Sequence, residues 1–391
     1  MNGELQVLVD GLAKRLGRSV LIGDRHFRLI THSSVDGEID PVRFRSIVER
    51  AGPPEAIQWV LSLGVDKAEG PLRLPSNEGV AMRSRVCVPL RYAGAHLGYL
   101  WLIDDDGSLG DADLVETIHV ADGAAEVLFR SAARRTQEHT EEAQALRALI
   151  GSDSVEQSNA LTALGELGQF RSGEGIIIVM VEPLEQAGEE IIDVLDEVAA
   201  GVVAPADHLT AEIDSRGVLL VTASALGAED GGIVGFANAA LALARKTLGE
   251  SVIGISGEYN EPSRANVAYD EALQAVRVAR QVPSLGGVAL WSDLGAYRAL
   301  VRLPVDHRGM IEPGIRRLMS EPGGKELTEL LGVYLNSACD AANAALTLKV
   351  HRSNLYRRLR RIEEITGLDL DRGEDRLSAH LSLKLVELGA S

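Results

Sequence analysis

Cysteine, aromatic residues and lysine are all scarce in this sequence. The 391 residues include two cysteines, Cys87 and Cys339, which lie far apart outside any CxxC pair, so neither a disulfide framework nor a zinc site is predicted. Aromatic residues make up 4%, so the cores must consist chiefly of Ala, Leu, Val and Ile. Lysine supplies six of the 39 basic residues and arginine the rest. Because arginine is so common in this chain, only its position in a structural element can indicate a function.

Long apolar runs and clustered metal ligands are also missing. No run approaches the ~18–20 apolar residues that a membrane-spanning helix requires. Residues 1–17 lack the apolar region of a signal peptide. The nine histidines are scattered without an HxxxH pair, so we expect no metal and no cofactor. These features predict a cytoplasmic protein that does not contact a membrane.

The acidic balance of the chain is unevenly distributed. The formal net charge is −18, which taken alone argues against binding to nucleic acid. Residues 325–391, however, are neutral, and residues 349–361 hold six basic side chains and no acidic one. A local basic stripe on an acidic protein is typical of a surface that binds phosphates.

The hydrophobic pattern divides the chain into domains. Residues 1–130 combine short strands, a hairpin that turns at Ala93-Gly94 and a helix over 111–129, which predicts an α+β domain. Residues 131–154 continue as a helical connector. The apolar seam of this long helix is interrupted by Arg135, His139 and Glu142, which leaves open a dimerising coiled coil or a solvated helix between domains. The seam consists of Ile118, Ala121, Ala125, Leu128, Ala132, Leu146 and Leu149. Residues 155–300 alternate strands with helices and predict an α/β layer.

Residues 311–391 predict an all-α domain with a helix-turn-helix. A helix begins at Lys325, Asp340 is suited to cap a short alanine-rich helix, and Lys349-Val350 forms a turn. A further helix follows and ends near Gly367.

This last helix has two opposite faces. Leu355, Leu359 and Ile362 recur at helical spacing and form the buried face. The opposite face is suited to a DNA major groove, where Arg pairs with guanine and Asn with adenine. An ordinary arginine-rich surface helix is the alternative, but no Glu precedes these arginines by four residues to neutralise them. The predicted DNA-binding residues are His351, Arg352, Ser353, Asn354, Tyr356, Arg357, Arg358, Arg360 and Arg361.

The stretch VHRSNLYRRLRRIEEITGLDL resembles the C-terminal domain of the PucR/CdaR family of bacterial regulators, whose helix-turn-helix is similar to that of the Fis nucleoid protein. The sequence departs from the family at Ser353-Asn354, where Asn-Thr is common, and at Lys349, where helix-turn-helix proteins often have Gly. The resemblance implies a degenerate GGDEF-like middle domain. Residues 213–221, IDSRGVLLV, stand where active cyclases have GG(D/E)EF, and they lack its glycine and acidic pairs. The hairpin over 86–104 resembles that of GAF domains, which sense small molecules.

We therefore expect a multidomain transcriptional regulator with a GAF-like sensor, a GGDEF-like middle domain and no catalytic residues. The resemblance implies control of a catabolic or metabolic operon, as an activator, in response to an unidentified effector. Expected partners are double-stranded DNA, the effector and a second copy in a homodimer or larger homo-oligomer, with RNA polymerase as a candidate. The alternatives are a cyclase-like enzyme with an appended DNA-binding domain and an architectural DNA binder. The missing acidic signature argues against the first, and the long acidic portion against the second.

Overall fold

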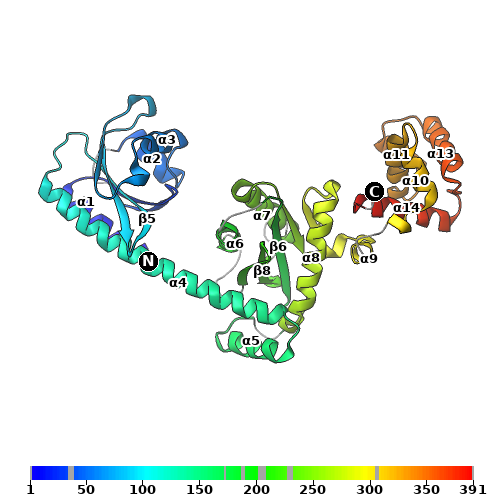
Figure 1. The fold of residues 1–391 in the computed structure, drawn as a ribbon, viewed down its shortest axis with the longest axis horizontal. Coiled ribbons are helices and arrows are strands. Elements are labelled where there is room, and N and C mark those ends of the chain that lie inside the picture. The colour runs from blue at the N-terminus through cyan, green and yellow to red at the C-terminus, as the bar shows by residue number, and fades with distance from the viewer. Residues whose placement is uncertain are drawn as a thin grey trace. The chain divides into compact units, whose positions relative to one another are not determined.

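The computed structural model describes residues 2–33, 39–170, 173–185, 190–200, 208–226, 232–303 and 308–389. The chain divides into two compact units, residues 1–138 and 139–391 (Figure 1). Helix α4 runs from the first unit into the second (Asp111–Ile150). No helix among the described residues is both long and apolar enough to span a bilayer.

The first unit is built on a five-stranded antiparallel sheet in the order β2-β1-β5-β4-β3. The hairpin of β4 and β5 turns at Ala93 and Gly94, which both have positive φ (49° and 84°), as the predicted two-residue turn requires. The strands are β1 (Val20–Asp24), β2 (Leu29–His32), β3 (Leu72–Leu74), β4 (Arg85–Tyr92) and β5 (Ala95–Ile103), and the helices are α1 (Asn2–Leu16), α2 (Pro41–Val48), α3 (Pro54–Ser62) and the start of α4.

This sheet has a separate hydrophobic cluster on each face. Because side chains alternate along a strand, Val86, Val88 and Leu90 of β4 pack with α1 and α4. Cys87, between them, belongs to the opposite cluster with residues of α2 and α3, and it is fully buried. Helices α2 and α3 are short and were not predicted from the sequence.

The second unit contains a five-stranded sheet in the order β10-β9-β6-β8-β7. Helices α6 and α7 cover one face of this sheet and α8 covers the other (Figure 1). The alanine-rich face of α8 lies so close to β9 that a Cβ on Gly254 would come within 2.4 Å of the Val276 backbone nitrogen. The elements are α5 (Ser154–Glu166), β6 (Ile176–Pro183), α6 (Glu190–Ala200), β7 (His208–Ile213), β8 (Arg216–Thr222), α7 (Gly232–Leu248), β9 (Ser251–Ile255), α8 (Ala265–Gln281) and β10 (Val288–Leu290).

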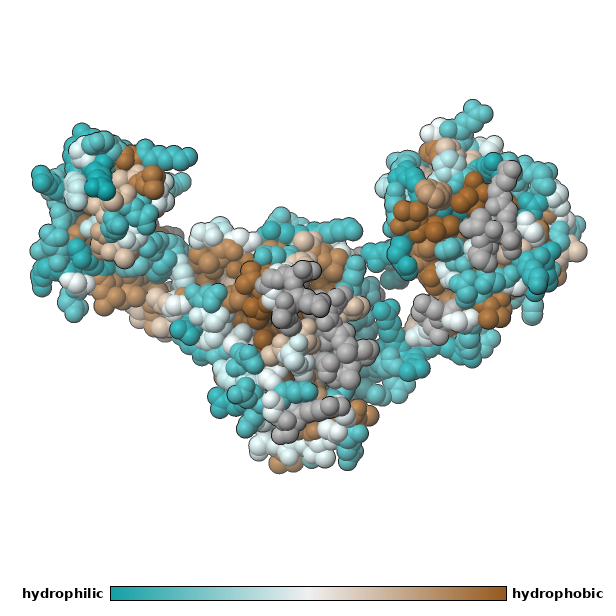
Figure 2. Space-filling view, turned by 180° about the vertical axis from the view of Figure 1, so that it is seen from behind, coloured by the Kyte–Doolittle hydropathy of each residue, from teal (hydrophilic) through white to brown (hydrophobic). Residues whose placement is uncertain are grey.

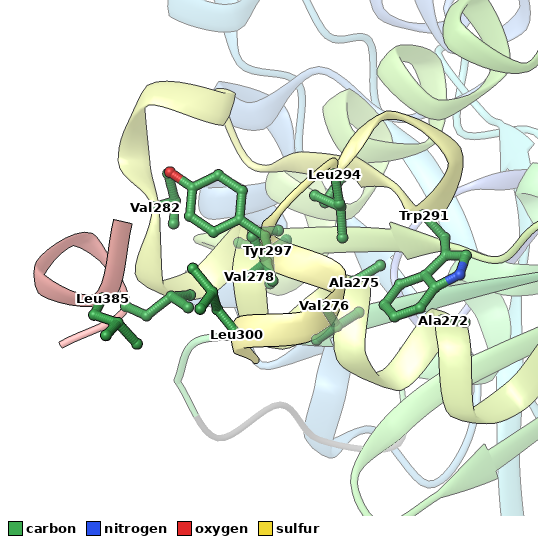
Figure 3. Packing of buried hydrophobic residues seen from close by; sticks show 14 of the residues in the cluster. Ala272, Ala275, Val276, Val278, Val282, Trp291, Leu294, Tyr297, Leu300 and Leu385 are labelled. Atoms are coloured by element: carbon green, nitrogen blue, oxygen red, sulfur yellow. The ribbon is translucent and has the colours of Figure 1, made fainter. Parts of the chain in front are cut away.

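The rest of the second unit is helical, which agrees with the predicted all-α C-terminal domain. It consists of α9 (Tyr297–Leu300), α10 (Pro313–Ser320), α11 (Gly324–Asn336), α12 (Ala341–Thr347), α13 (Arg352–Thr366) and α14 (Gly373–Glu387). Figure 3 shows Tyr297 and Leu300 of α9 among apolar residues of α8 and Leu385 of α14. Lys384 Nζ also donates to the Tyr297 hydroxyl at 3.0 Å, so α9 is held to α14 by polar and apolar contacts.

The apolar seam predicted along the connector is largely buried within the units. Ala121 and Ala125 lie in the core of the first unit, and Leu146 and Leu149 lie in that of the second. Ala132, midway along the helix, is exposed. Most of the seam is therefore already covered by the chain's own domains and does not form a continuous strip for a second helix.

Candidate nucleic-acid interface

The turn that orients α13 is a Schellman motif formed at the end of α12. Asp340 caps the start of α12 by accepting bonds from the Ala342 and Asn343 backbone nitrogens (2.7 and 3.2 Å), as predicted. At its end, the Lys349 nitrogen donates to Leu346 and the Val350 nitrogen to Ala345. This pattern requires a left-handed residue at the first position past the helix, and Lys349 adopts φ 54° there. The glycine common at this position in helix-turn-helix proteins has this conformational reason.

Helix α13 begins and ends with its own caps. His351 is the N-cap, and its Nδ1 accepts from the Ser353 backbone nitrogen at 3.3 Å. Gly367 ends the helix in the left-handed region at φ 75°, as predicted. Close packing with α10 holds this end, because a Cβ on Gly314 would lie 2.2 Å from the Thr366 carbonyl oxygen.

The inner face of α13 is apolar, as the helical spacing predicts. Leu355, Leu359 and Ile362 are at most 6% exposed and pack with the Ala344 and Ala345 side chains of α12. The helix cannot rotate about its axis without exposing these residues to water. Its outer face is therefore fixed in orientation.

The outer face of α13 is basic and exposed. Ser353, Tyr356, Arg357, Arg360 and Arg361 lie there and, with Glu364, line a shallow hollow. Arg357 donates to the Asn354 side chain at 3.1 Å and Arg361 pairs with Glu364 at 3.1 Å. In Figure 2 the lobe of the helix-turn-helix presents a mainly hydrophilic surface.

The other predicted residues lie at the edges of this face. His351 and Arg352 are exposed at the start of the helix, and Asn354 and Arg358 are half-buried at its flanks. In a helix-turn-helix, the N-terminal residues of the recognition helix contact base edges, while flanking arginines contact phosphates. The arrangement therefore provides the surface that groove binding requires, and the role of each side chain remains a prediction.

The middle domain contains a buried carboxylate that the sequence did not single out. Glu182, at the end of β6, is 6% exposed and accepts from Arg216 and Arg280, each at 2.7 Å. Arg216 follows the tight β7–β8 turn, in the segment where active cyclases carry their acidic pair, and Gly217 comes next. A Cβ on Gly217 would lie 2.9 Å from Ile191 of α6, so close packing requires this glycine. Two guanidinium groups thus occupy the oxygens of Glu182. Among the described residues no cluster of three or more His, Cys, Asp or Glu could hold a metal ion.

The second missed feature is a pair of arginines in the first unit. Arg43 and Arg85 are 1% and 5% exposed, and Arg85 pairs with buried Asp40. The abundance of arginine hides such residues in the sequence. The Asp40-Pro41 pair, a capping residue followed by proline, is the only local signal.

Two family models match the chain. The PucR C-terminal helix-turn-helix domain matches residues 327–385, and the GGDEF-like domain matches residues 151–278. The first match contains α12 and α13, and the second contains the β7–β8 hairpin. The expected resemblance to these two domain types is thereby confirmed.

Curated relatives match nearly the whole chain. The proline-responsive transcriptional activator PutR of Bacillus subtilis (strain 168) is 22% identical over 401 residues, covering 98% of this chain and 97% of PutR. The DNA-binding transcriptional activator AdeR of the same organism is 22% identical over 394 residues, covering 97% and 92%. A solved regulator of polyketide synthase expression from Bifidobacterium adolescentis aligns with 63% of this chain and 93% of its own, with 16% identity and a TM-score of 0.32. The two matches place a GGDEF-like domain before a PucR C-terminal helix-turn-helix domain in this chain.

Proposed function

We propose that this protein is a cytoplasmic, sequence-specific DNA-binding activator of a catabolic or metabolic operon, with α13 as its recognition helix. The observation that carries the proposal is the division of α13 into a buried face of Leu355, Leu359 and Ile362 and an exposed face with Arg357, Arg360 and Arg361. The similarity to two transcriptional activators supports it.

A selection from random DNA tests the proposal. Full-length protein is incubated with random double-stranded DNA, and bound duplexes are amplified over several rounds and sequenced. We expect a common, near-palindromic motif, because one recognition helix covers few base pairs and paired copies gain affinity. Enrichment of no motif would contradict sequence-specific binding.

Point variants then test the assignment of α13. Arg357→Ala is expected to weaken binding to the selected site by about 1–3 kcal/mol if that guanidinium reads a base. Arg372→Ala is the matched control, because Arg372 is exposed, stands at the start of α14 outside α13, and the variant loses the same charge. Equal affinities of the two variants at one salt concentration would remove Arg357 from the interface.

The middle domain is proposed to be non-catalytic. Metal-assisted phosphoryl transfer needs carboxylates that are free to bind the metal. In this domain Arg216 and Arg280 already pair with Glu182. Purified protein with GTP and either Mg²⁺ or Mn²⁺ is expected to yield no cyclic dinucleotide on chromatography, and a product peak would favour the cyclase alternative.

Self-association and effector control complete the proposal. We infer a homodimer or larger homo-oligomer, with RNA polymerase as a further partner, and a small-molecule effector bound by the GAF-like first unit. The description of PutR as proline-responsive supports control by a metabolite. An effector shifts the protein between two arrangements only if it binds one of them more tightly. Sedimentation of the full chain at several concentrations measures the self-association.

A further inference from the structure

The first unit contains a cavity between its sheet and helices α2 and α3. It holds about 510 Å³ of empty space, part of which is open to solvent. Its walls are formed by Phe27, Val42, Ala56, Val60 and Trp101, among others. Because part of this space is open, the enclosed part suits only a compact molecule.

Charge is unbalanced at one wall of the cavity. Arg43 and Arg85 both line it, and both are almost completely buried. Asp40 is the carboxylate that pairs with Arg85. Its oxygens also accept hydrogen bonds from the backbone nitrogens of Arg43 and Arg83, at 2.7 and 2.8 Å. Two cations therefore share one carboxylate within the described part of this wall.

The guanidinium of Arg43 has only neutral hydrogen-bond partners in the described residues. Nη1 donates to Ser19 Oγ and Nη2 to the Trp101 carbonyl oxygen, both at 3.2 Å. A guanidinium has five N–H groups, and burying its charge without a counter-ion is costly. Consistent with this cost, burial lowers the pKa of Arg43 to about 9, with repulsion from Arg85 as the second cause.

The remaining walls restrict the ligand further. Phe27 stacks on Tyr99 with ring centroids 5.0 Å apart, and it is held at φ 62°, a strained region for an aromatic residue. Among the described residues that line the cavity, Arg43 and Arg85 are the only charged ones. None of these lining residues therefore offers a carboxylate to an ammonium group. An amino acid would have to bury its ammonium beside two cations.

We propose that this cavity binds a small monocarboxylate with a compact apolar body and no ammonium group, with the carboxylate against Arg43. The proposal rests on the proposed function in that the ligand would serve as the effector. The carboxylate would neutralise the excess positive charge, and the apolar body would lie against the aromatic and aliphatic walls.

Calorimetric titration of the full chain without DNA tests the site. The probes are benzoate and 3-methylbutanoate, compared with their neutral amides and with proline as a zwitterion. We expect at least one of the two carboxylates to bind, and each amide and proline to bind at least tenfold more weakly. Binding of neither carboxylate, or equal binding of the amide, overturns the proposal.

Three variants separate the site from the fold. Arg43→Met keeps the bulk of the side chain and removes the charge, so it should lose the binding at least tenfold while the melting temperature of the unliganded protein stays equal or rises. Ala56→Leu fills the cavity and should lose binding with the charge intact. Arg45→Met is the matched control two residues away on α2, where Arg45 pairs with Glu49 and Glu55 outside the cavity, and it should bind like the wild type. Unchanged binding in both Arg43→Met and Ala56→Leu refutes the site.

The same protein samples distinguish a failure of this proposal from a failure of the proposed function. Carboxylate binding is measured without DNA, so it can succeed when no DNA motif is selected. Carboxylate binding that leaves DNA affinity and transcription unchanged would retain the site and reject its role as effector site. A selected DNA motif without carboxylate binding would reject the site and retain the DNA-binding function.

Discussion

Replacing Lys349 by glycine is expected to stabilise the helix-turn-helix. Lys349 is exposed and stands at φ 54°, and its backbone hydrogen bonds fix that conformation at the end of α12. A left-handed conformation costs an L-residue about 1–2 kcal/mol, and glycine avoids that cost. Glycine also loses about 0.4–1 kcal/mol through the greater freedom of the unfolded chain.

The difference between the midpoints of these two ranges is a gain of about 0.8 kcal/mol in the free energy of unfolding. For a unit of this size, such a gain raises the melting temperature by about 1–4 °C. Urea unfolding followed by circular dichroism, with calorimetry of the full chain, measures both quantities. The midpoint should rise while the slope against urea stays the same.

Lys349→Ala is the matched control for this prediction. Alanine removes the same charge as glycine but keeps the left-handed strain, so its stability should stay within about 0.5 kcal/mol of the wild type. Both variants should weaken DNA binding equally and, if Lys349 contacts a phosphate, lower the slope of log affinity against log salt by about 0.9. A glycine variant that unfolds at the same or a lower urea concentration than the alanine variant would refute the strain argument.

Three further predictions concern burial. Gly254→Ala should destabilise the protein by about 1–3 kcal/mol, because the added methyl group overlaps the backbone of α8. Gly165→Ala is the control, because open space surrounds Gly165 on α5, and it should stabilise the protein by up to about 1 kcal/mol. Urea unfolding measures the free energy of unfolding of both variants. Burial raises the pKa of the Cys87 thiol, so iodoacetamide should label half-buried Cys339 first in native protein, and equal labelling rates by mass spectrometry would contradict this burial. Burial also lowers the pKa of His380 in the folded protein. As the pH falls, the imidazole of the unfolded chain is therefore protonated before that of the folded chain. The free energy of unfolding should decrease as the pH falls below about 6.5, the ordinary pKa of histidine. His380→Gln should show a smaller loss of unfolding free energy between about pH 7 and pH 5, and an identical pH profile would count against it.

The sequence by itself was sufficient for the helix-turn-helix because its signals are local. Asp340 as a cap, Gly367 as a left-handed end and the spacing of Leu355, Leu359 and Ile362 each depend on residues within a few positions. The family motif then distinguished α13 from an ordinary surface helix, and the domain comparison confirmed the helix-turn-helix. The β4–β5 hairpin and the alternation of strands and helices in the middle domain were predictable for the same reason.

Features that depend on distant residues were decided only by the tertiary structure. Glu182 and Arg280 are separated by most of the middle domain and meet only when α8 packs on the sheet. In an arginine-rich sequence the residue type does not distinguish Arg43 from Arg45 two positions away, yet helix α2 buries the first and leaves the second half-exposed. Burial and charge pairing arise from how the layers pack, so the buried cation that defines the cavity became visible only in the folded chain.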